Sequence, residues 1–227
     1  PSGEYCNAAA LLADSNHFPG IDIARFGGSI NIIHSRHTFE RTSVLEQMQR
    51  TLEVFDTYYA YEEIVGFERI TKTLVPREAF REAIANALVH RCWDVRANIK
   101  VGMFADRIEI TSPGGLPAGI TEELYLAGGP SVARNPILAN VFFRLGHIER
   151  FGTGIPRIRD EYAHETVSPS FALRDSSITV MLPVTVLENV TLDEEAILAV
   201  LAKGSALTRS QILSLIHISE PTRLRCI

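Results

Sequence analysis

The apolar positions of residues 78–90 recur with the period of a helix, and the same stretch carries three polar side chains at regular spacing. Residues four apart share one face of a helix. One face is therefore expected to present Glu82, Asn86 and His90. The opposite face is apolar and is expected to enter a core through Phe80, Ile84, Ala87 and Leu88. Pro76 suits the first turn of this helix, where its missing N–H costs nothing.

A second helical pattern covers residues 43–55. Ser43 and Glu46 have the spacing of a capping box at its start. Its apolar stripe consists of Val44, Leu45, Met48, Leu52 and Phe55. We interpret these residues as structural.

The pattern changes to that of strands over residues 98–110, where apolar and polar side chains alternate. Residues 105–107 are expected to form the turn of a hairpin. Residues 112–117, Ser-Pro-Gly-Gly-Leu-Pro, are expected to form a loop, because prolines and glycines interrupt a strand. A closing strand is expected over residues 177–184, with its end at Pro183.

Two glycines, Gly152 and Gly154, stand just before a helical pattern carried by Ile155, Ile158 and Tyr162. Unpaired N–H groups at a helix N-terminus that glycines approach form a site for anions. A single Gly-Thr-Gly is weak evidence. The order of the whole chain, with an acid–amide helix, a hairpin, a glycine loop, a second glycine segment and closing strands, is a stronger signal.

A carboxylate one helical turn from a carboxamide is a combination that a magnesium–nucleotide site can use. The amide oxygen of Asn86 is a hard ligand for Mg²⁺, and the carboxylate of Glu82 can orient and deprotonate a water. A solvated helix face is the alternative interpretation of the spacing alone. His90 has two alternative roles. It could hydrogen-bond a phosphate or Glu82, or it could interact with the helix dipole at the C-terminus of the helix.

The composition of the chain limits which classes of protein it can belong to. The chain has 227 residues, 46% of them hydrophobic, a mean hydropathy of +0.08 and no apolar run of the roughly 18 residues that span a membrane. We expect a cytoplasmic protein without a membrane partner. The net charge of −5 argues against nucleic-acid binding over the whole surface but leaves room for a local basic region. Three cysteines without paired spacing support neither a disulfide framework nor a zinc site.

Four runs of sequence carry a resemblance to a known family, and they cover residues 81–91, 106–117, 134–136 and 152–155. They are similar to bacterial proteins named RecG-like ATP-dependent DNA helicases or transcriptional regulators. The central domain of those proteins resembles the GHKL ATPases, the superfamily of gyrase B, MutL and the histidine kinases. The resemblance extends over residues 30–185.

The resemblance implies an α+β fold, a two-layer α/β sandwich of the GHKL type, that binds ATP and Mg²⁺. Glu82 would be the general base and Asn86 the Mg²⁺ ligand. Arg134 would lie in a lid over the nucleotide, hinged at Gly128 and Gly129, with an ordinary surface arginine as the alternative. The other residues implied at the nucleotide are His90, Ser112, Gly114, Gly115, Gly152, Thr153 and Gly154.

This chain departs from the family pattern at two positions. ATP-hydrolysing relatives begin the first glycine segment with an aspartate that reads the adenine amino group, and Ser112 stands at that position here. A serine hydroxyl accepts a hydrogen bond without charge assistance, so weaker binding or a different ligand is expected. Cys92 stands where the family commonly has an aspartate, and the sequence does not indicate the consequence.

The resemblance also suggests a domain organisation. Residues 1–29 would be the end of a truncated Alba-like, Schlafen-type DNA-binding domain, and residues 30–190 the ATPase-like domain. Residues 191–212 are expected to begin a winged helix-turn-helix, with a short helix, a turn at Lys203-Gly204 and a second helix opening at Thr208. A helical hairpin used for dimerisation is an equally good interpretation of the last segment, so a homodimer remains open.

Residues 213–223, Leu-Ser-Leu-Ile-His-Ile-Ser-Glu-Pro-Thr-Arg, correspond to a translation of the transposon-end adapter used to prepare sequencing libraries. We therefore expect residues 213–227 to be a translated adapter tail and exclude them from fold and function. On this interpretation the chain is a fragment, and its start at Pro1 agrees.

Three functions follow from these patterns. The first is a DNA-binding transcriptional regulator in which Mg-ATP controls flanking DNA-binding domains. The second is an ATPase or helicase, although the chain has no Gly-x-x-x-x-Gly-Lys-Ser/Thr phosphate loop, so hydrolysis would have to use Glu82 and Asn86. The third is a degenerate scaffold that binds no nucleotide. A histidine kinase is a weaker fourth interpretation, since no phosphoacceptor helix pair precedes the core.

Overall fold

The computed structural model describes residues 6–117, 119–128, 132–148 and 152–185. Its helices are α1 (Asn7–Leu12), α2 (Val44–Tyr59), α3 (Arg77–His90), α4 (Glu122–Leu126), α5 (Pro136–Arg144) and α6 (Gly154–Asp160). Its strands are β1 (Ile21–Phe26), β2 (Ile33–Phe39), β3 (Ala60–Val65), β4 (Glu68–Thr73), β5 (Ile99–Met103), β6 (Arg107–Pro113), β7 (Ser170–Arg174) and β8 (Ser177–Pro183).

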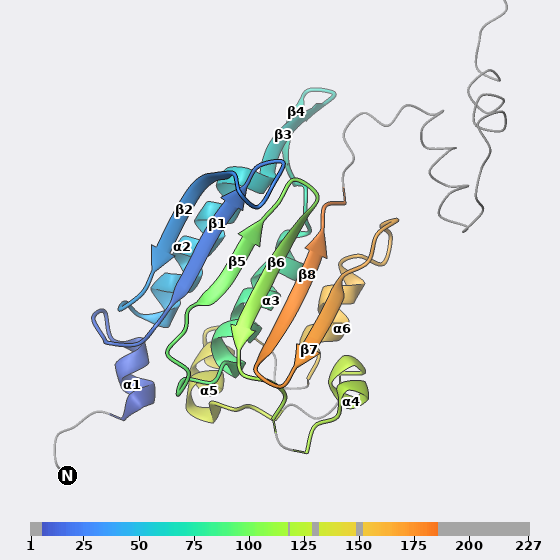
Figure 1. Ribbon diagram of the computed structural model, residues 1–227. Coiled ribbons are helices and arrows are strands. Elements are labelled where there is room, and N and C mark those ends of the chain that lie inside the picture. Colours follow the sequence, from blue (N-terminus) through green and yellow to red (C-terminus); the bar gives the residue numbers. More distant parts are fainter. Residues whose placement is uncertain (1–5, 118, 129–131, 149–151, 186–227) are drawn as a thin grey trace, which may run out of the picture. The chain divides into compact units, whose positions relative to one another are not determined.

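The centre of the fold is a mixed six-stranded sheet in the order β2-β1-β5-β6-β8-β7. β1 and β5 run parallel, and the other neighbours run antiparallel. Figure 1 shows α2, α3 and α6 on one face of this sheet. Along β1, β5 and β6, buried side chains alternate with less buried ones, as a sheet covered on one face requires. The expected mixed α+β architecture, with helices layered on a central sheet, is confirmed.

Both helices expected from the apolar pattern are present. α3 covers residues 77–90, with Pro76 at the N-cap, one position before the first turn where it was expected. α2 begins after Ser43 as expected but continues to Tyr59. Ser43 Oγ accepts from Leu45 N, whereas a capping box would use Glu46 N. The two helices meet in the core, where the Phe55 and Phe80 rings stack with centroids 4.4 Å apart.

The hairpin expected over residues 98–110 is formed by β5 and β6, with Met103 opposite Ile108. The expectation that Ser112 and Pro113 lie in a loop is wrong, because both continue β6 and pair with β8. The N–H and C=O of a strand residue point to the same side, and the Pro113 carbonyl accepts from Cys92 N. On that side Pro113 lies past the β5 residues that pair with β6, so no ladder hydrogen bond needs its N–H. The missing N–H of Pro113 therefore leaves no gap in the sheet.

The apolar pattern did not indicate the β3–β4 hairpin, a separate two-stranded sheet that projects from the domain (Figure 1). It also did not indicate that residues 1–29 contribute to the central sheet. β1 pairs in parallel with β5, and the described residues form one compact unit. The segment that the resemblance assigns to a preceding domain thus supplies an interior strand of this one.

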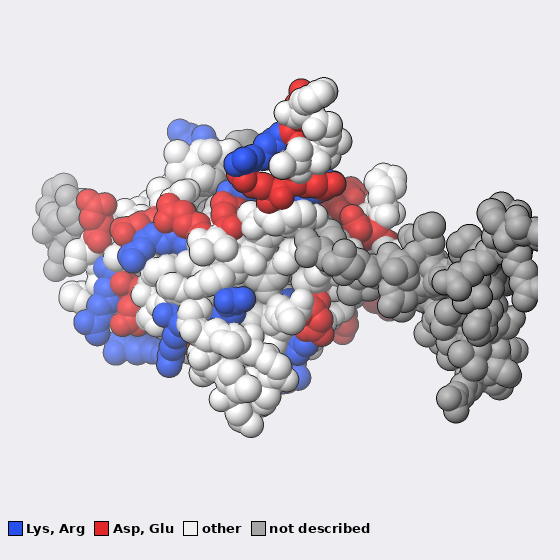
Figure 2. Space-filling model, turned by 90° about the horizontal axis from the view of Figure 1, so that it is seen from above, with Lys and Arg blue, Asp and Glu red and all other residues white. Residues whose placement is uncertain are grey.

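Basic and acidic side chains lie beside one another on the face seen in Figure 2. Ion pairs on the strands of the sheet join Arg36 with Asp22 and Arg107 with Glu109. Within the described residues, no helix is long and apolar enough to cross a membrane. The winged-helix segment at 191–212 and the adapter tail at 213–227 lie outside the described residues and stay predictions.

Candidate functional site

Glu82 and Asn86 lie one turn apart near the middle of α3 and contact each other directly. The Asn86 Nδ2 atom donates to Glu82 Oε1 across 3.1 Å. A carboxylate can only accept, so the nitrogen of the Asn86 amide faces Glu82 and its oxygen is directed elsewhere. The pair therefore presents an amide oxygen beside a carboxylate, as the spacing predicted.

The alternative of a solvated helix face is wrong for Glu82, which is 2% exposed. α3 packs against the sheet on one side and against α5 and α6 on others. Two guanidinium groups lie near the second carboxylate oxygen. Arg157 Nη1 is 3.7 Å and Arg81 Nη2 is 3.9 Å from Glu82 Oε2. A buried carboxylate needs such charge partners.

Glu82, Asn86 and His90 line one side of a cavity of about 420 Å³. The glycine segments contribute Gly115, Gly152 and Gly154 to the same cavity. Its apolar wall comes from α4, α5, α6, β8 and the intervening segments, through Ile120, Leu124, Val132, Ala139, Ile148, Ile155 and Ile178. Tyr125 also lines it, and burial raises the pKa of this phenol to about 12. A mostly apolar cavity with a few convergent polar groups is typical of a small-molecule site.

Gly154 allows α6 to begin directly against the acid–amide pair. A Cβ atom at this position would lie 2.7 Å from Asn86 Nδ2 and 2.7 Å from Glu82 Oε1. Real Cβ atoms do not approach other atoms so closely, so any larger residue would displace one of the two side chains. The second glycine segment and the helix predicted to carry the acid are thus in contact.

Four residues that the resemblance placed at the nucleotide are not among the cavity-lining residues, namely Ser112, Gly114, Arg134 and Thr153. Ser112 is buried and its Oγ donates to Ala87 O across 3.0 Å, so it braces β6 against α3. Thr153 is the N-cap of α6. Arg134 is held by a 2.6 Å hydrogen bond from Nη2 to Gly115 O.

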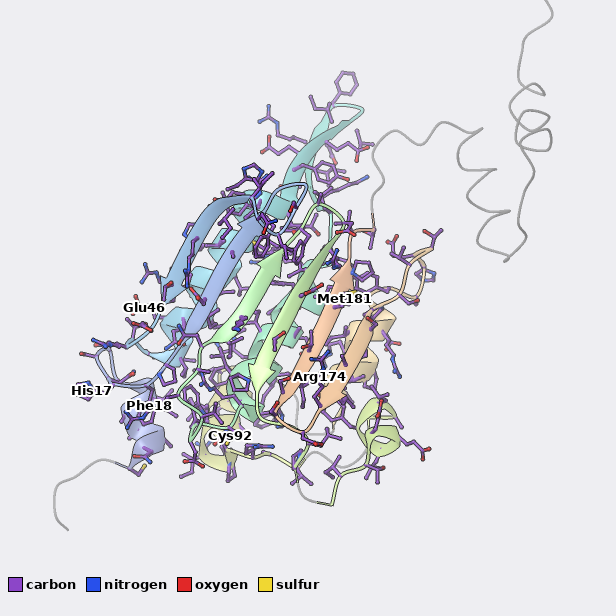
Figure 3. The ribbon with its side chains drawn as sticks, in the orientation of Figure 1. His17, Phe18, Glu46, Cys92, Arg174 and Met181 are labelled. Atoms are coloured by element: carbon purple, nitrogen blue, oxygen red, sulfur yellow. The ribbon has the colours of Figure 1, made fainter. Side chains whose placement is uncertain are left out.

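Gly114 forms the turn at the end of β6. Its φ of +102° suits glycine, and an added Cβ would lie 2.7 Å from Cys92 Cβ. Cys92, labelled in Figure 3, lies at the end of the sheet where β6 finishes. The second glycine of this pair, Gly115, is the one that reaches the cavity.

Asn135 has a structural role that the sequence analysis did not identify. Its Nδ2 atom donates to Val89 O at 2.7 Å and to Arg91 O at 3.0 Å. These bonds satisfy carbonyl groups at the C-terminal end of α3. The Arg-Asn-Pro run at 134–136 was noted only as part of the resemblance. A side-chain cap supplied from 44 and 46 residues away leaves no local sequence pattern.

The His90 imidazole is largely enclosed. Burial, and then the positive charge of Arg134, lower the pKa of His90. The neutral form is favoured at neutral pH, so His90 can offer one N–H donor and one acceptor to a molecule in the cavity.

The side chains at the site can be compared with the ligands that Mg²⁺ takes in proteins. Within the described residues, no three His, Cys, Asp or Glu side chains gather as a metal-binding group. Mg²⁺ commonly takes few protein ligands and completes its shell with water and substrate phosphates. Asn86 lines the cavity and its Nδ2 binds Glu82, so its amide oxygen could serve as the single protein ligand that this mode of binding requires, with the nucleotide supplying most of the others.

Comparisons with known proteins agree with part of this picture. Residues 96–182 match a family described as "Putative ATP-dependent DNA helicase recG C-terminal". The match runs from before β5 into β8 and includes both glycine segments, but it does not include α3. Over this range the chain is similar to the ATPase-type domain of RecG-like proteins.

A solved structure is also similar. It is the crystal structure of the DIP2311 protein from Corynebacterium diphtheriae, with a TM-score of 0.65 and 26% sequence identity over 78% of this chain. This chain spans 36% of the length of that protein. A search of the curated proteins gave no match.

Proposed function

We propose that this domain binds Mg-ATP in the cavity beside α3 and acts as a nucleotide-dependent regulator of flanking DNA-binding segments. The observation that carries the proposal is the hydrogen-bonded Glu82–Asn86 pair, whose carboxylate is buried, at the side of a cavity that the glycine segments also line. The match of residues 96–182 to an ATPase-type family supports a nucleotide as the ligand.

The roles of the side chains follow from their chemistry. The Asn86 amide oxygen would hold Mg²⁺, and the bound ion would neutralise and orient the phosphates. The backbone of Gly115, Gly152 and Gly154 can approach phosphate oxygens closely. The apolar wall formed by residues such as Ile120, Ile155 and Ile178 suits a stacked base. Glu82 lies close enough to Asn86 to orient a water at the same site.

We assign the fold to the GHKL type within this proposal. The order of acid–amide helix, antiparallel hairpin, glycine turn and second glycine segment supports it. The regulatory role rests on DNA-binding elements outside the described domain, including the proposed winged-helix start at 191–212. Helicase activity has less support, because the sequence lacks the phosphate loop of helicase motors.

A scaffold that binds no nucleotide is the second candidate, and one observation favours it. Ser112, at the position where relatives read adenine with an aspartate, faces Ala87 O instead of the cavity. Among the described lining residues, Glu82 is the acid. Base recognition by a carboxylate is therefore not provided there.

Calorimetric titration of the full chain with ATP, in the presence and absence of Mg²⁺, separates the two candidates. Binding that requires Mg²⁺ and is lost in Asn86→Ala supports the nucleotide switch. The matched control is Asn31→Ala, which removes an exposed amide in the β1–β2 turn. No heat from the wild-type chain at millimolar Mg-ATP would favour the scaffold.

A further inference from the structure

The second oxygen of the Glu82 carboxylate lies near two arginines from different helices. Arg81 neighbours Glu82 on α3, and Arg157 lies on α6, three residues after Gly154. Their guanidinium nitrogens are 3.9 and 3.7 Å from Glu82 Oε2. Asn86 meanwhile binds Oε1. Both oxygens of this buried side chain therefore have partners on fixed elements.

Arg81 is held mainly by two groups other than Glu82. Arg81 Nε donates to Glu78 Oε2 at 2.7 Å, and its Nη1 donates to His147 O at 2.7 Å. Those two short hydrogen bonds use the Nε and Nη1 donors of the Arg81 guanidinium, so Glu82 is a secondary partner of Arg81. Arg157 reaches Glu82 from the first turns of α6, whose start already abuts the Glu82–Asn86 pair at Gly154.

We propose that Arg157 is a positioning residue, which fixes the orientation of the Glu82 carboxylate and makes it depend on the placement of the second glycine segment. This inference rests on the proposed function, since it assigns Glu82 the role of general base. Gly154 lines the cavity, and Arg157 follows one helical turn later, so α6 links ligand contact to the acid.

The step that depends on this orientation is the attack of water on ATP. The water oxygen forms a bond to the γ-phosphorus while the bond from that phosphorus to the bridging oxygen of ADP breaks. The electron pair of the broken bond stays on ADP, and the water proton passes to Glu82, which later releases it to solvent. Proton transfer requires the carboxylate oxygen within hydrogen-bond reach of the water, so a rotated Glu82 slows the step without preventing nucleotide binding.

The test compares Arg157→Gln, Arg157→Lys and wild type by steady-state ATPase rate and by calorimetric Kd for Mg-ATP. We expect Arg157→Gln to lower kcat about tenfold or more while Kd changes less than about threefold. Arg157→Lys keeps a cation near Glu82 and should recover part of the rate. The control is Arg144→Gln, an exposed arginine in the last turn of α5, which should behave as wild type.

A second measurement reports the contact independently of turnover. The fall in Tm caused by Arg157→Gln should be smaller in a Glu82→Gln background than in wild type, because the charge that Arg157 faces is already gone. Additive shifts in Tm would overturn the contact itself.

The other outcomes are distinguishable from one another. If Arg157→Gln raises Kd for Mg-ATP by a larger factor than it lowers kcat, Arg157 binds the nucleotide. That result would overturn the positioning role. A wild-type chain that binds Mg-ATP without hydrolysing it would also overturn that role, while leaving the binding proposal intact. Absence of Mg-ATP binding by the wild-type chain would reject the proposed function as well.

Discussion

The Asn86 side chain donates a 3.1 Å hydrogen bond to the carboxylate of Glu82 one turn earlier on α3. This contact fixes how the two side chains meet, because the carboxylate takes the amide nitrogen and leaves the amide oxygen as an acceptor for another group. The start of α6 at Gly154 closes against both side chains. The following predictions depend on this arrangement.

Replacing Glu82 with glutamine should separate binding from turnover. The glutamine amide keeps the size of the side chain but cannot take a proton from water. We expect Mg-ATP affinity within a few-fold of wild type and a loss of hydrolysis of about 10² or more. Calorimetry and a phosphate-release assay measure the two quantities. Equal loss of both would indicate that the substitution disturbs the fold.

Gly154→Ala should weaken ligand binding at the site while changing the unfolding free energy of the domain little. The added Cβ would lie 2.7 Å from the ends of the Asn86 and Glu82 side chains, which can rotate away. Alanine also favours a helix over glycine by about 1 kcal/mol. We expect an unfolding free energy within about 1 kcal/mol of wild type, together with weakened Mg-dependent binding. The control is Gly28→Ala, where the added atom meets nothing within 4 Å.

Replacing Ser112 with the aspartate of related ATPases should not improve ATP binding. Ser112 is buried and donates to Ala87 O, and an aspartate there would place a carboxylate against a carbonyl oxygen. We expect Ser112→Asp to lower the unfolding free energy by about 2–4 kcal/mol without tightening ATP binding. Ser112→Ala should cost only about 1 kcal/mol. Chemical denaturation gives both values, and tighter ATP binding by the aspartate variant would contradict this account.

Asn135→Ala should destabilise the domain by about 1–3 kcal/mol, because Val89 O and Arg91 O lose a shared donor at the end of α3. Urea denaturation measures the change. The exposed Asn31 supplies the comparison, and Asn31→Ala should be nearly neutral. A neutral result at Asn135 would mean that water replaces the side-chain cap.

His90 should make stability depend on pH. Its pKa is lowered in the folded state, so below about pH 6.5 the unfolded chain binds more protons and folding stability falls with decreasing pH. His90→Gln should flatten this decline when unfolding is followed from pH 7.5 to 5. His147, whose pKa burial and Arg81 also lower, would supply a remaining slope.

The sequence determined the elements that carry their own pattern. The apolar periodicity identified α2 and α3, alternation identified the β5–β6 hairpin, and four-residue spacing placed Glu82 and Asn86 on one face. The closing strand that ends at Pro183 was also expected and is β8. Local geometry is sufficient for these features, because a helix brings residues four apart together whatever surrounds it.

Tertiary structure decided what that spacing means. The burial of Glu82 and the approach of Arg157 depend on α6, which is encoded more than 70 residues later. The orientation of Ser112 toward Ala87 O depends on how β6 packs on α3. The place of β1 in the central sheet was also missed, since its pairing with β5 joins residues distant in sequence. The β3–β4 hairpin is local, but most of its side chains are exposed or half-buried, so it carries no apolar alternation. A sequence pattern records which face a side chain occupies, whereas contacts between elements determine whether that face meets water, a cavity or another helix.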